Sequence, residues 1–399
     1  NGENVTFPAN GYRGEYIIDI ARQLKEKHQQ AFVSPAELVM QHLPVDEPQG
    51  GDKELYIDAV IGRMKELLGS QFPMVSEESL SGILGDICND LAEFGVPFDN
   101  WYSERDLVTS GMVDKMLERL KASGHTYEKE GALWFRSTDF TDDKDRVLVR
   151  ANGQRTYFAN DVAYHLSKFD RGFDIVIDVF GSDHHGYVPR MKSAIEACGI
   201  NPERMIHLLG QFVTLYRGGQ QVQMSTRGGE FVSLRELRSE VGNDAGHIIH
   251  MMTKYAQHIA FDLHFGQSKS NENPVYYMQY AHARICSVFK QLPEKEMTFN
   301  EVNGIAHLSL LTSPQERQLL NILSRYREVI VDAALNYEPQ LLINYLRDLA
   351  GEFHAYYNSQ QFLVEEHDLR DARLALIASI RQILVNGFGM LNVSAPESM

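Results

Sequence analysis

Hydrophobic residues recur with helical spacing through most of the first 125 positions. The run 14–43 places apolar residues three and four apart, and Pro35 interrupts it, so two helices are expected there. Further elements predicted in this part are helices over 54–69, 76–96 (with Ser76 as N-cap) and 106–124, and a short strand over 96–104.

Strands alternate with helices between residues 126 and 242. The predicted order is strands over 126–138 and 145–158 with an Asn152-Gly153 turn, a helix over 159–172 capped by Asn160, a buried strand over 173–180, a helix over 187–199, a strand and hairpin over 205–226, and a helix over 233–242. This alternation is typical of an α/β layer with a parallel sheet.

Long amphipathic helices fill the chain beyond about residue 270 and predict an all-α bundle. The helical stretches are 273–292, 313–336, 339–360 and 369–391. We therefore divide the chain into an α/β domain over 1–242 with a helical insertion at about 14–124, a connecting segment over 243–270, and a helical domain over 271–399.

Composition adds limits on compartment and ligand. The formal net charge is −16, which disfavours sequence-independent nucleic-acid binding, although a folded RNA could still bind a local basic surface. The isolated Cys88, Cys198 and Cys286 suggest free thiols in a reducing compartment and offer no CxxC zinc motif. No apolar run of about 18 residues occurs, so no membrane span is predicted.

The stretch GSDHHG, residues 181–186, follows a predicted buried strand and precedes a helix. Ligands of parallel sheets bind at the carboxyl ends of strands, which favours a polar substrate contact for Asp183, His184 and His185. There are two alternatives: these residues only close a turn, or they bind a metal. Adjacent histidines point in different directions, and no HxxxH partner is near, so the metal site is the weakest of the three.

Two more stretches carry candidate chemistry. Tyr157 and Asp161 are four residues apart, and a phenol with a carboxylate suits a guanidinium ligand, although Asp161 could instead complement a helix dipole. The polar loop 222–234 holds Ser225, Thr226 and Arg227 beside two glycines and could cradle phosphates.

Taken in order, these stretches resemble the bacterial arginyl-tRNA synthetases. The similarity covers about residue 10 to the C-terminus, through GYRGEYIIDIA, the segment LWFRSTDF to IEACG, VQMSTRGGEFVSLRELRSEVG and NENPVYYMQYAHARICSV. The resemblance implies a class I Rossmann-like catalytic core, here partial, followed by a helical anticodon-binding domain. It implies ligation of arginine to tRNA(Arg) through an arginyl-adenylate, with ATP and Mg²⁺ as substrates and no structural metal.

The resemblance also assigns roles. It implies a KMSKS-like catalytic loop at Met224, Ser225, Thr226 and Arg227, and ATP binding at Gly181, Ser225 and Arg227. It implies that arginine is bound by Tyr157, Asp161, Asp183 and His184. It also implies that the tRNA anticodon is contacted by Tyr277, Gln279, Tyr280 and Met399. A cytoplasmic monomer with no membrane partner is expected for this family.

Departures from the family pattern leave two other functions open. The family carries an H-x-G-H turn ahead of the region matched here, and no H-x-G-H occurs in this sequence. Gln223, Gly246-His247 and His264 also differ from the expected residues, which we interpret as drift. The alternatives are a non-catalytic tRNA-binding paralog and, more weakly, a metal-dependent phosphoesterase that uses Asp183, His184 and His185.

We predict that the isolated 399-residue chain catalyses no arginine-dependent ATP–pyrophosphate exchange, because half of the expected ATP site is supplied by the H-x-G-H turn. The measurement is isotope exchange with purified chain at saturating arginine and ATP. Exchange above the level of an arginine-free control would contradict the prediction.

Overall fold

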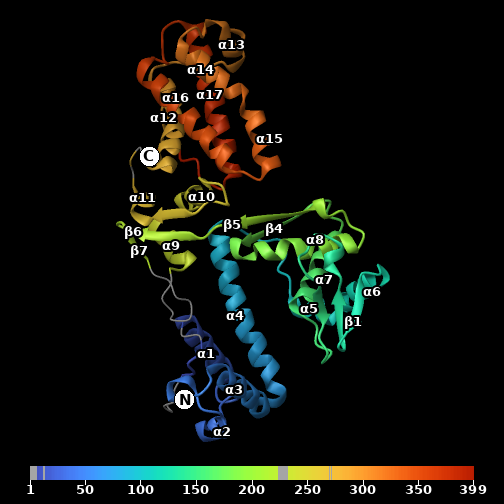
Figure 1. Ribbon diagram of the computed structural model, residues 1–399. Coiled ribbons are helices and arrows are strands. Elements are labelled where there is room, and N and C mark those ends of the chain that lie inside the picture. Colours follow the sequence, from blue (N-terminus) through green and yellow to red (C-terminus); the bar gives the residue numbers. More distant parts are fainter. Residues whose placement is uncertain (1–6, 12–13, 223–231, 269, 271) are drawn as a thin grey trace. The chain divides into compact units, whose positions relative to one another are not determined.

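The computed structural model describes all residues except 1–6, 12–13, 223–231, 269 and 271 (Figure 1). The chain forms two compact units, one made of Asn1–Phe98 with Tyr216–Gly246 and the other of Asp99–Leu215 with His247–Met399. The predicted order of an α/β segment followed by a helical bundle is confirmed. The domain boundaries at 242 and 270 stay predictions.

Helices make up most of the first unit. They are α1 (Glu15–His28), α2 (Ala36–Met40), α3 (Lys53–Leu68), α4 (Phe72–Glu93) and α9 (Leu234–Val241). Ion pairs hold α9 against the end of α4, since Arg235 donates to Asp86 at 2.7 Å and to Asp90 at 2.9 Å, and Arg238 pairs with Glu93. Ser233 and Glu236 form a capping box that fixes the start of α9.

Two predictions in this unit are wrong. Helix α4 begins at Phe72 rather than near Ser76, and Pro73 occupies its first turn, where a missing N–H costs nothing. The segment 96–104 contains no strand. The amide of Val96 instead donates to the carbonyl of Leu91 at 2.8 Å, which completes the end of α4 and takes that group out of any sheet.

The second unit opens with two helices, which are followed by an antiparallel meander and then a βαβ unit. Its elements are α5 (Glu104–Thr109), α6 (Met112–Ala122), β1 (Thr126–Lys129), β2 (Ala132–Phe135), β3 (Arg146–Val149), α7 (Tyr157–Asp170), β4 (Val176–Gly181), α8 (Val188–Ala197) and β5 (Met205–Gly210). Strands β4 and β5 pair in parallel from Val176↔Met205 to Gly181↔Gly210. Helix α8 makes the crossover between them, which is the arrangement that alternating strands and helices predict.

Three local predictions for this segment need correction. The helix expected over 106–124 is divided, because Gly111 adopts φ +75°, a left-handed conformation that ends one helix and begins the next. Helix α7 is capped by Thr156 rather than Asn160, which lies inside its first turn. Strand β4 is buried only at alternate residues, with Ile177 and Val179 exposed, so it is covered on one face.

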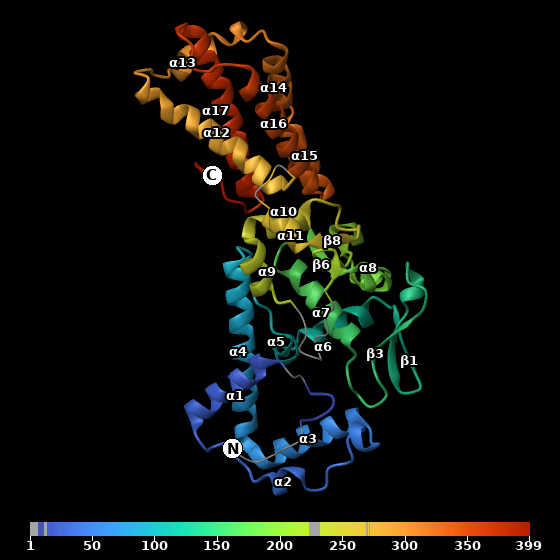
Figure 2. The same ribbon diagram turned by 90° about the vertical axis from the view of Figure 1, so that its left-hand side faces the viewer.

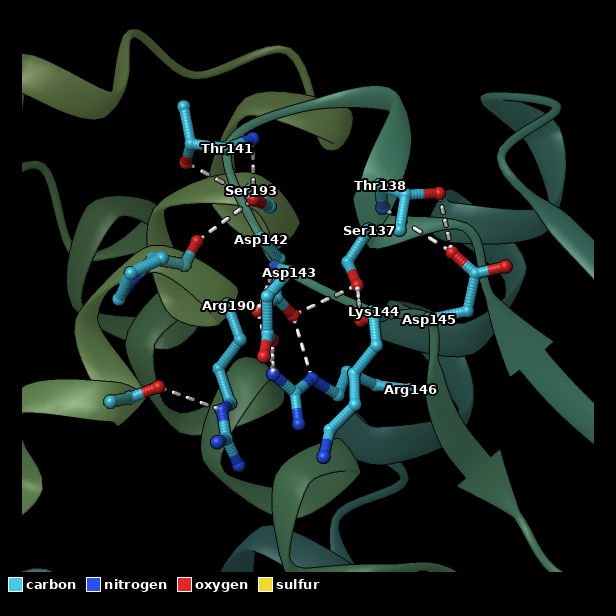
Figure 3. Close-up of polar contacts among 12 residues, drawn as sticks. Ser137, Thr138, Thr141, Asp142, Asp143, Lys144, Asp145, Arg146, Arg190 and Ser193 are labelled. Carbon is cyan, nitrogen blue, oxygen red and sulfur yellow. Dashed lines mark hydrogen bonds and ion pairs between the residues drawn. The ribbon is translucent and has the colours of Figure 1, made fainter.

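A polar network organises the acidic stretch that precedes β3 (Figure 3). Asp142 accepts two hydrogen bonds from Arg146, at 2.6 and 2.7 Å, and one from Ser137 at 2.9 Å. Burial acts to raise the pKa of Asp142, but the bonds from Arg146 and Ser137 outweigh it and lower the pKa to about 2. The amide of Thr141 donates to Ser193 on α8, so the network also joins this loop to the crossover helix.

The remaining elements of the second unit lead into the bundle. Strand β6 (Val213–Arg217) continues into the first unit, where it pairs with β7 (Gln220–Gln221). The other elements are α10 (Asn243–Met251), β8 (Ile259–Asp262), α11 (Leu263–Gln267), α12 (Pro274–Glu294), α13 (Glu301–Ala306), α14 (Pro314–Ser324), α15 (Tyr326–Asn336), α16 (Gln340–Ser359) and α17 (His367–Met390). Helices α12, α16 and α17 pack side by side (Figures 1 and 2). The predicted helix 313–336 is divided at Arg325, and α13 was not predicted.

Cys88, Cys198 and Cys286 are free thiols, as predicted, and the last two are buried. Burial raises the pKa of Cys198 to about 11, so its thiol stays protonated at neutral pH. Among the described residues, no helix is both long and apolar enough to span a membrane.

A buried ion pair joins α7 to β4. The carboxylate of Asp178 lies 2.9 Å from Nε2 of His165 and 2.7 Å from Nζ of Lys168, both on α7. Burial acts to raise the pKa of Asp178, but the His165 bond and the charges of His165 and Lys168 lower it to about 2. Asp178 and His165 are 5% and 3% exposed, so water screens this interaction little.

We predict that Asp178→Asn lowers the free energy of unfolding of this segment by about 2 kcal/mol at pH 7. Because the folded pKa of Asp178 lies below the unfolded one, the deficit is complete above about pH 4 and shrinks as the pH falls towards 2. Urea unfolding followed by tryptophan fluorescence measures it, since both tryptophans, Trp101 and Trp134, lie in this segment.

Asp174→Asn is the matched control, because its side chain is fully exposed four positions earlier in the chain. Equal unfolding free energies for Asp178→Asn and Asp174→Asn at pH 7 would show that the buried pair stabilises nothing.

Candidate active site

The first two turns of α7 carry the predicted guanidinium ligands. Thr156 caps the helix by accepting a hydrogen bond from the amide of Ala159 at 3.3 Å, so Tyr157 is the first helical residue. Tyr157 and Asp161 are therefore one turn apart on the same helix face, rather than on either side of a strand-to-helix junction. The side chain of Tyr157 is 80% exposed and is free to contact a ligand.

Tyr187 connects Asp161 to the end of β4. Its hydroxyl donates a hydrogen bond to Oδ2 of Asp161. Burial, and then the Asp161 carboxylate, raise the pKa of Tyr187 far above its usual value, so the hydroxyl remains a donor at neutral pH. This bond holds one oxygen of Asp161 and fixes the direction of the other. Tyr187 was not predicted as a site residue, although it directly follows the GSDHHG stretch.

The predicted residues after β4 form the 3-10 helix η4 (Ser182–Tyr187). Asp183 and His184 lie 3.8 Å apart, are both exposed, and His184 stacks on Phe180 with ring centroids 5.5 Å apart. A Cβ atom on Gly181 would come within 2.5 Å of the Asp183 carboxylate, so the observed position of that side chain over the strand end depends on the glycine.

A metal at Asp183, His184 and His185 gains no support from this geometry. In the described part of the chain, no cluster of three or more His, Cys, Asp or Glu side chains could hold a metal ion. His185 instead uses Nδ1 in a 3.2 Å contact with the carbonyl of Ser182, within its own 3-10 helix.

The KMSKS-like loop at Met224, Ser225, Thr226 and Arg227 lies outside the described residues. The catalytic and ATP-binding roles assigned to this loop therefore stay predictions. The 157–161 stretch and the 3-10 helix η4 (Ser182–Tyr187) are brought together, because Asp161 and Tyr187 are bonded directly.

The helical bundle presents a half-buried aromatic and arginine cluster on α12 and α16. The guanidinium of Arg284 lies 4.4 Å from the ring centre of Tyr280 and 4.7 Å from that of Tyr357. Arg284 also donates to Nδ1 of His354 at 3.1 Å, while Nε2 of His354 donates to the carbonyl of Tyr277. Burial, with the Arg284 charge, lowers the pKa of His354, which agrees with a neutral ring that accepts at one nitrogen.

The predicted Gln279 and Met399 belong to a second arrangement on α12. Gln279 is 7% exposed, and its amide donates to the carbonyl of Ser394 at 3.0 Å. His282 donates through Nδ1 to the carbonyl of Pro396 at 2.8 Å. These bonds pin the C-terminal segment along α12, and Met399 at its end is 50% exposed.

Comparison with known proteins agrees with this geometry. Residues 99–260 match the family "tRNA synthetases class I (R), catalytic domain", and residues 278–399 match the "DALR anticodon binding domain". The chain is 55% identical to the arginine–tRNA ligase of Thioalkalivibrio sulfidiphilus and 54% identical to that of Legionella pneumophila strain Corby, over its whole length and 68% of each relative.

A solved structure gives the same result. The putative arginyl-tRNA synthetase of Campylobacter jejuni superposes with a TM-score of 0.78 at 29% identity, covering the whole of this chain and 78% of that one. Neither alternative function, the non-catalytic paralog or the phosphoesterase, is supported by these similarities. The chain belongs to the arginyl-tRNA synthetase family of aminoacyl-tRNA ligases, with a class I catalytic domain and a DALR anticodon-binding domain.

Proposed function

We propose that this chain takes part in the ATP-dependent attachment of arginine to tRNA(Arg), and that Asp161 binds the arginine guanidinium. The observation that supports the arginine site is the Tyr187–Asp161 bond at the end of β4. A carboxylate with one oxygen held by a tyrosine hydroxyl can accept with its other oxygen from the planar fork of a guanidinium. Tyr157, exposed one turn earlier on the same face, adds a ring that can stack on it.

The other predicted residues complete the proposal. Asp183 and His184 at the end of β4 contact substrate, and Gly181 lets the ATP approach the strand closely. Residues Met224 to Arg227, with the Mg²⁺ bound to ATP, stabilise the charge on the departing pyrophosphate. We further propose a monomer in the cytoplasm, where reducing conditions suit three free thiols.

The cluster around Arg284 is the proposed anticodon contact. Tyr280, Arg284 and Tyr357 offer stacked planar groups at a half-buried surface, and unpaired loop bases of RNA stack on aromatic rings and guanidinium planes. Gln279 then acts indirectly, by holding the C-terminal segment that ends at Met399.

We predict that the chain binds L-arginine in preference to citrulline, which has the same shape but a neutral urea in place of the guanidinium. Asp161→Asn removes this preference, since only a carboxylate makes a charged bond to the guanidinium. Ligand-observed NMR titration measures both affinities. Asp170→Asn, an exposed carboxylate at the other end of α7, is the control and keeps the preference.

Two results would contradict this arginine site. One is a wild-type chain that does not distinguish arginine from citrulline. The other is an Asp161→Asn variant that still prefers arginine.

We also predict that Arg284→Ala weakens binding of a tRNA(Arg) anticodon stem-loop by about ten-fold, the loss expected for one stacked contact. Fluorescence anisotropy with labelled RNA measures the affinity. The control Arg327→Ala removes an exposed arginine from α15 of the same bundle. Equal losses in the two variants would mean that only general charge attraction was removed.

A further inference from the structure

The ring of His165 is buried between two oxygen atoms that can only accept hydrogen bonds. Its Nδ1 lies 2.7 Å from the backbone carbonyl oxygen of Asp161, and its Nε2 lies 2.9 Å from Oδ2 of Asp178. A carbonyl and an ionised carboxylate carry no hydrogen, so each ring nitrogen must supply one. The neutral ring has a hydrogen on one nitrogen only and would turn a lone pair towards an oxygen at the other end. The two contacts therefore require the imidazolium form of His165.

The charged and titratable groups around the ring agree with this form. Asp178 is ionised, because its Oδ1 lies 2.7 Å from Nζ of Lys168 and its pKa is about 2. His165 is 3% exposed, so water screens its attraction to that carboxylate little. His207 on β5 approaches the same carboxylate at 3.5 Å, but burial lowers its pKa and its ring is neutral at pH 7. Tyr187 on η4 has a raised pKa and adds no negative charge.

The bridge made by His165 ends at the residue that is proposed to bind the arginine guanidinium. Asp161 lies one turn before His165 on α7, and its carboxylate accepts a hydrogen bond from Tyr187. His165 thus holds the backbone of Asp161, whereas Tyr187 holds its side chain. The direction of a charged hydrogen bond to a planar guanidinium is sensitive to small shifts of the carboxylate, so both supports matter for its strength.

We propose, on the basis of the proposed function, that His165 is a positioning residue. As an imidazolium it ties the backbone of Asp161 to Asp178 on β4, and so directs the Asp161 carboxylate towards the guanidinium without touching the substrate. A positioning role and a purely structural role predict different effects on binding. A displaced Asp161 loses strength towards the charged guanidinium of arginine much more than towards the neutral urea of citrulline, whereas general loosening of the site weakens both ligands equally.

Two amide substitutions separate the two ends of the bridge. The side-chain nitrogen of glutamine reaches as far from the backbone as Nε2 of histidine, and that of asparagine reaches as far as Nδ1. His165→Gln therefore keeps a donor for Asp178 and loses the donor for Asp161, and His165→Asn does the reverse.

Ligand-observed NMR titration with arginine and citrulline measures the effect on binding. His165→Gln is expected to lower the ratio of the two affinities about five- to ten-fold, with the affinity for citrulline within about two-fold of wild type. His165→Asn is expected to retain most of the ratio. Urea unfolding is expected to rank the variants in the opposite order, because His165→Asn loses the bond to the buried Asp178 and is the less stable of the two.

Nitrogen-15 NMR of chain labelled at histidine tests the form of the ring directly. At pH 7 it distinguishes a ring with two N–H groups from a ring with one bare nitrogen, and the signals of His165 are those that disappear in His165→Gln. Two protonated nitrogens are expected. A bare nitrogen at His165 would overturn the inference even if the binding data agreed with it.

His307 provides the matched control, because it has similar partners in the helical bundle. Its Nδ1 lies 2.9 Å from the carbonyl oxygen of Asn303, also four residues earlier, and its Nε2 lies 3.5 Å from the carboxylate of Asp368. His307→Gln is expected to leave the affinities for arginine and citrulline, and their ratio, as in the wild-type chain.

The possible failures are distinguishable. A wild-type chain that prefers arginine, combined with a His165→Gln variant that keeps this preference or weakens both ligands equally, overturns the positioning role and leaves the proposed function standing. A loss of preference in His307→Gln equal to that in His165→Gln has the same meaning. A wild-type chain that does not distinguish arginine from citrulline overturns the proposed arginine site and this inference together.

Discussion

The buried carboxylate of Asp178 is the constraint on which the proposed catalytic geometry depends. It lies on the helix-covered face of β4 and is bound by His165 and Lys168 from α7. A charge in this position must be paired, because an isolated carboxylate out of water is very unfavourable. The pairing fixes the rotation of α7 about its axis, and that rotation decides which face of the helix points towards the strand ends.

The same interaction continues to the site. The other ring nitrogen of His165 donates to the backbone carbonyl of Asp161 at 2.7 Å, and the side chain of Asp161 accepts from Tyr187. Asp161 is thus held at two points. Its backbone carbonyl is bound by His165, which is itself bound to Asp178 on β4, and its carboxylate is bound by Tyr187, which follows β4. Such support is what a binding residue needs to stay within a fraction of an ångström of a useful position. His207, also within 3.5 Å of Asp178, has a lowered pKa because burial outweighs the attraction of that carboxylate.

The sequence was sufficient to predict the order of elements, because hydrophobic periodicity is local. The roles assigned to the candidate site residues stay predictions. It could not reveal that Asp178 is buried, since an aspartate inside an apolar run has the same letter whether it faces solvent or His165. Helix starts were misplaced at Ser76 and Asn160 because a nearby Pro or Thr cap decided them instead. At Gly246, a Cβ atom would come within 3.0 Å of the Phe94 ring, so a larger residue there requires that ring to shift by a few tenths of an ångström.

Charge distribution explains how so acidic a chain can belong to a family that acts on RNA. A net charge of −16 repels a polyanion over long distances, so productive contacts must come from places where a cation is left without an acidic partner. Two arginines of the α/β segment, Arg146 and Arg155, are not such places, because each is paired with an aspartate. Arg284 lies against the rings of Tyr280 and Tyr357 and pairs with no carboxylate among the described residues, so its charge stays available. On such an acidic surface, an RNA that cannot reach the unpaired arginines is repelled. Binding therefore depends on whether the shape of the RNA fits these sites, rather than on general charge attraction.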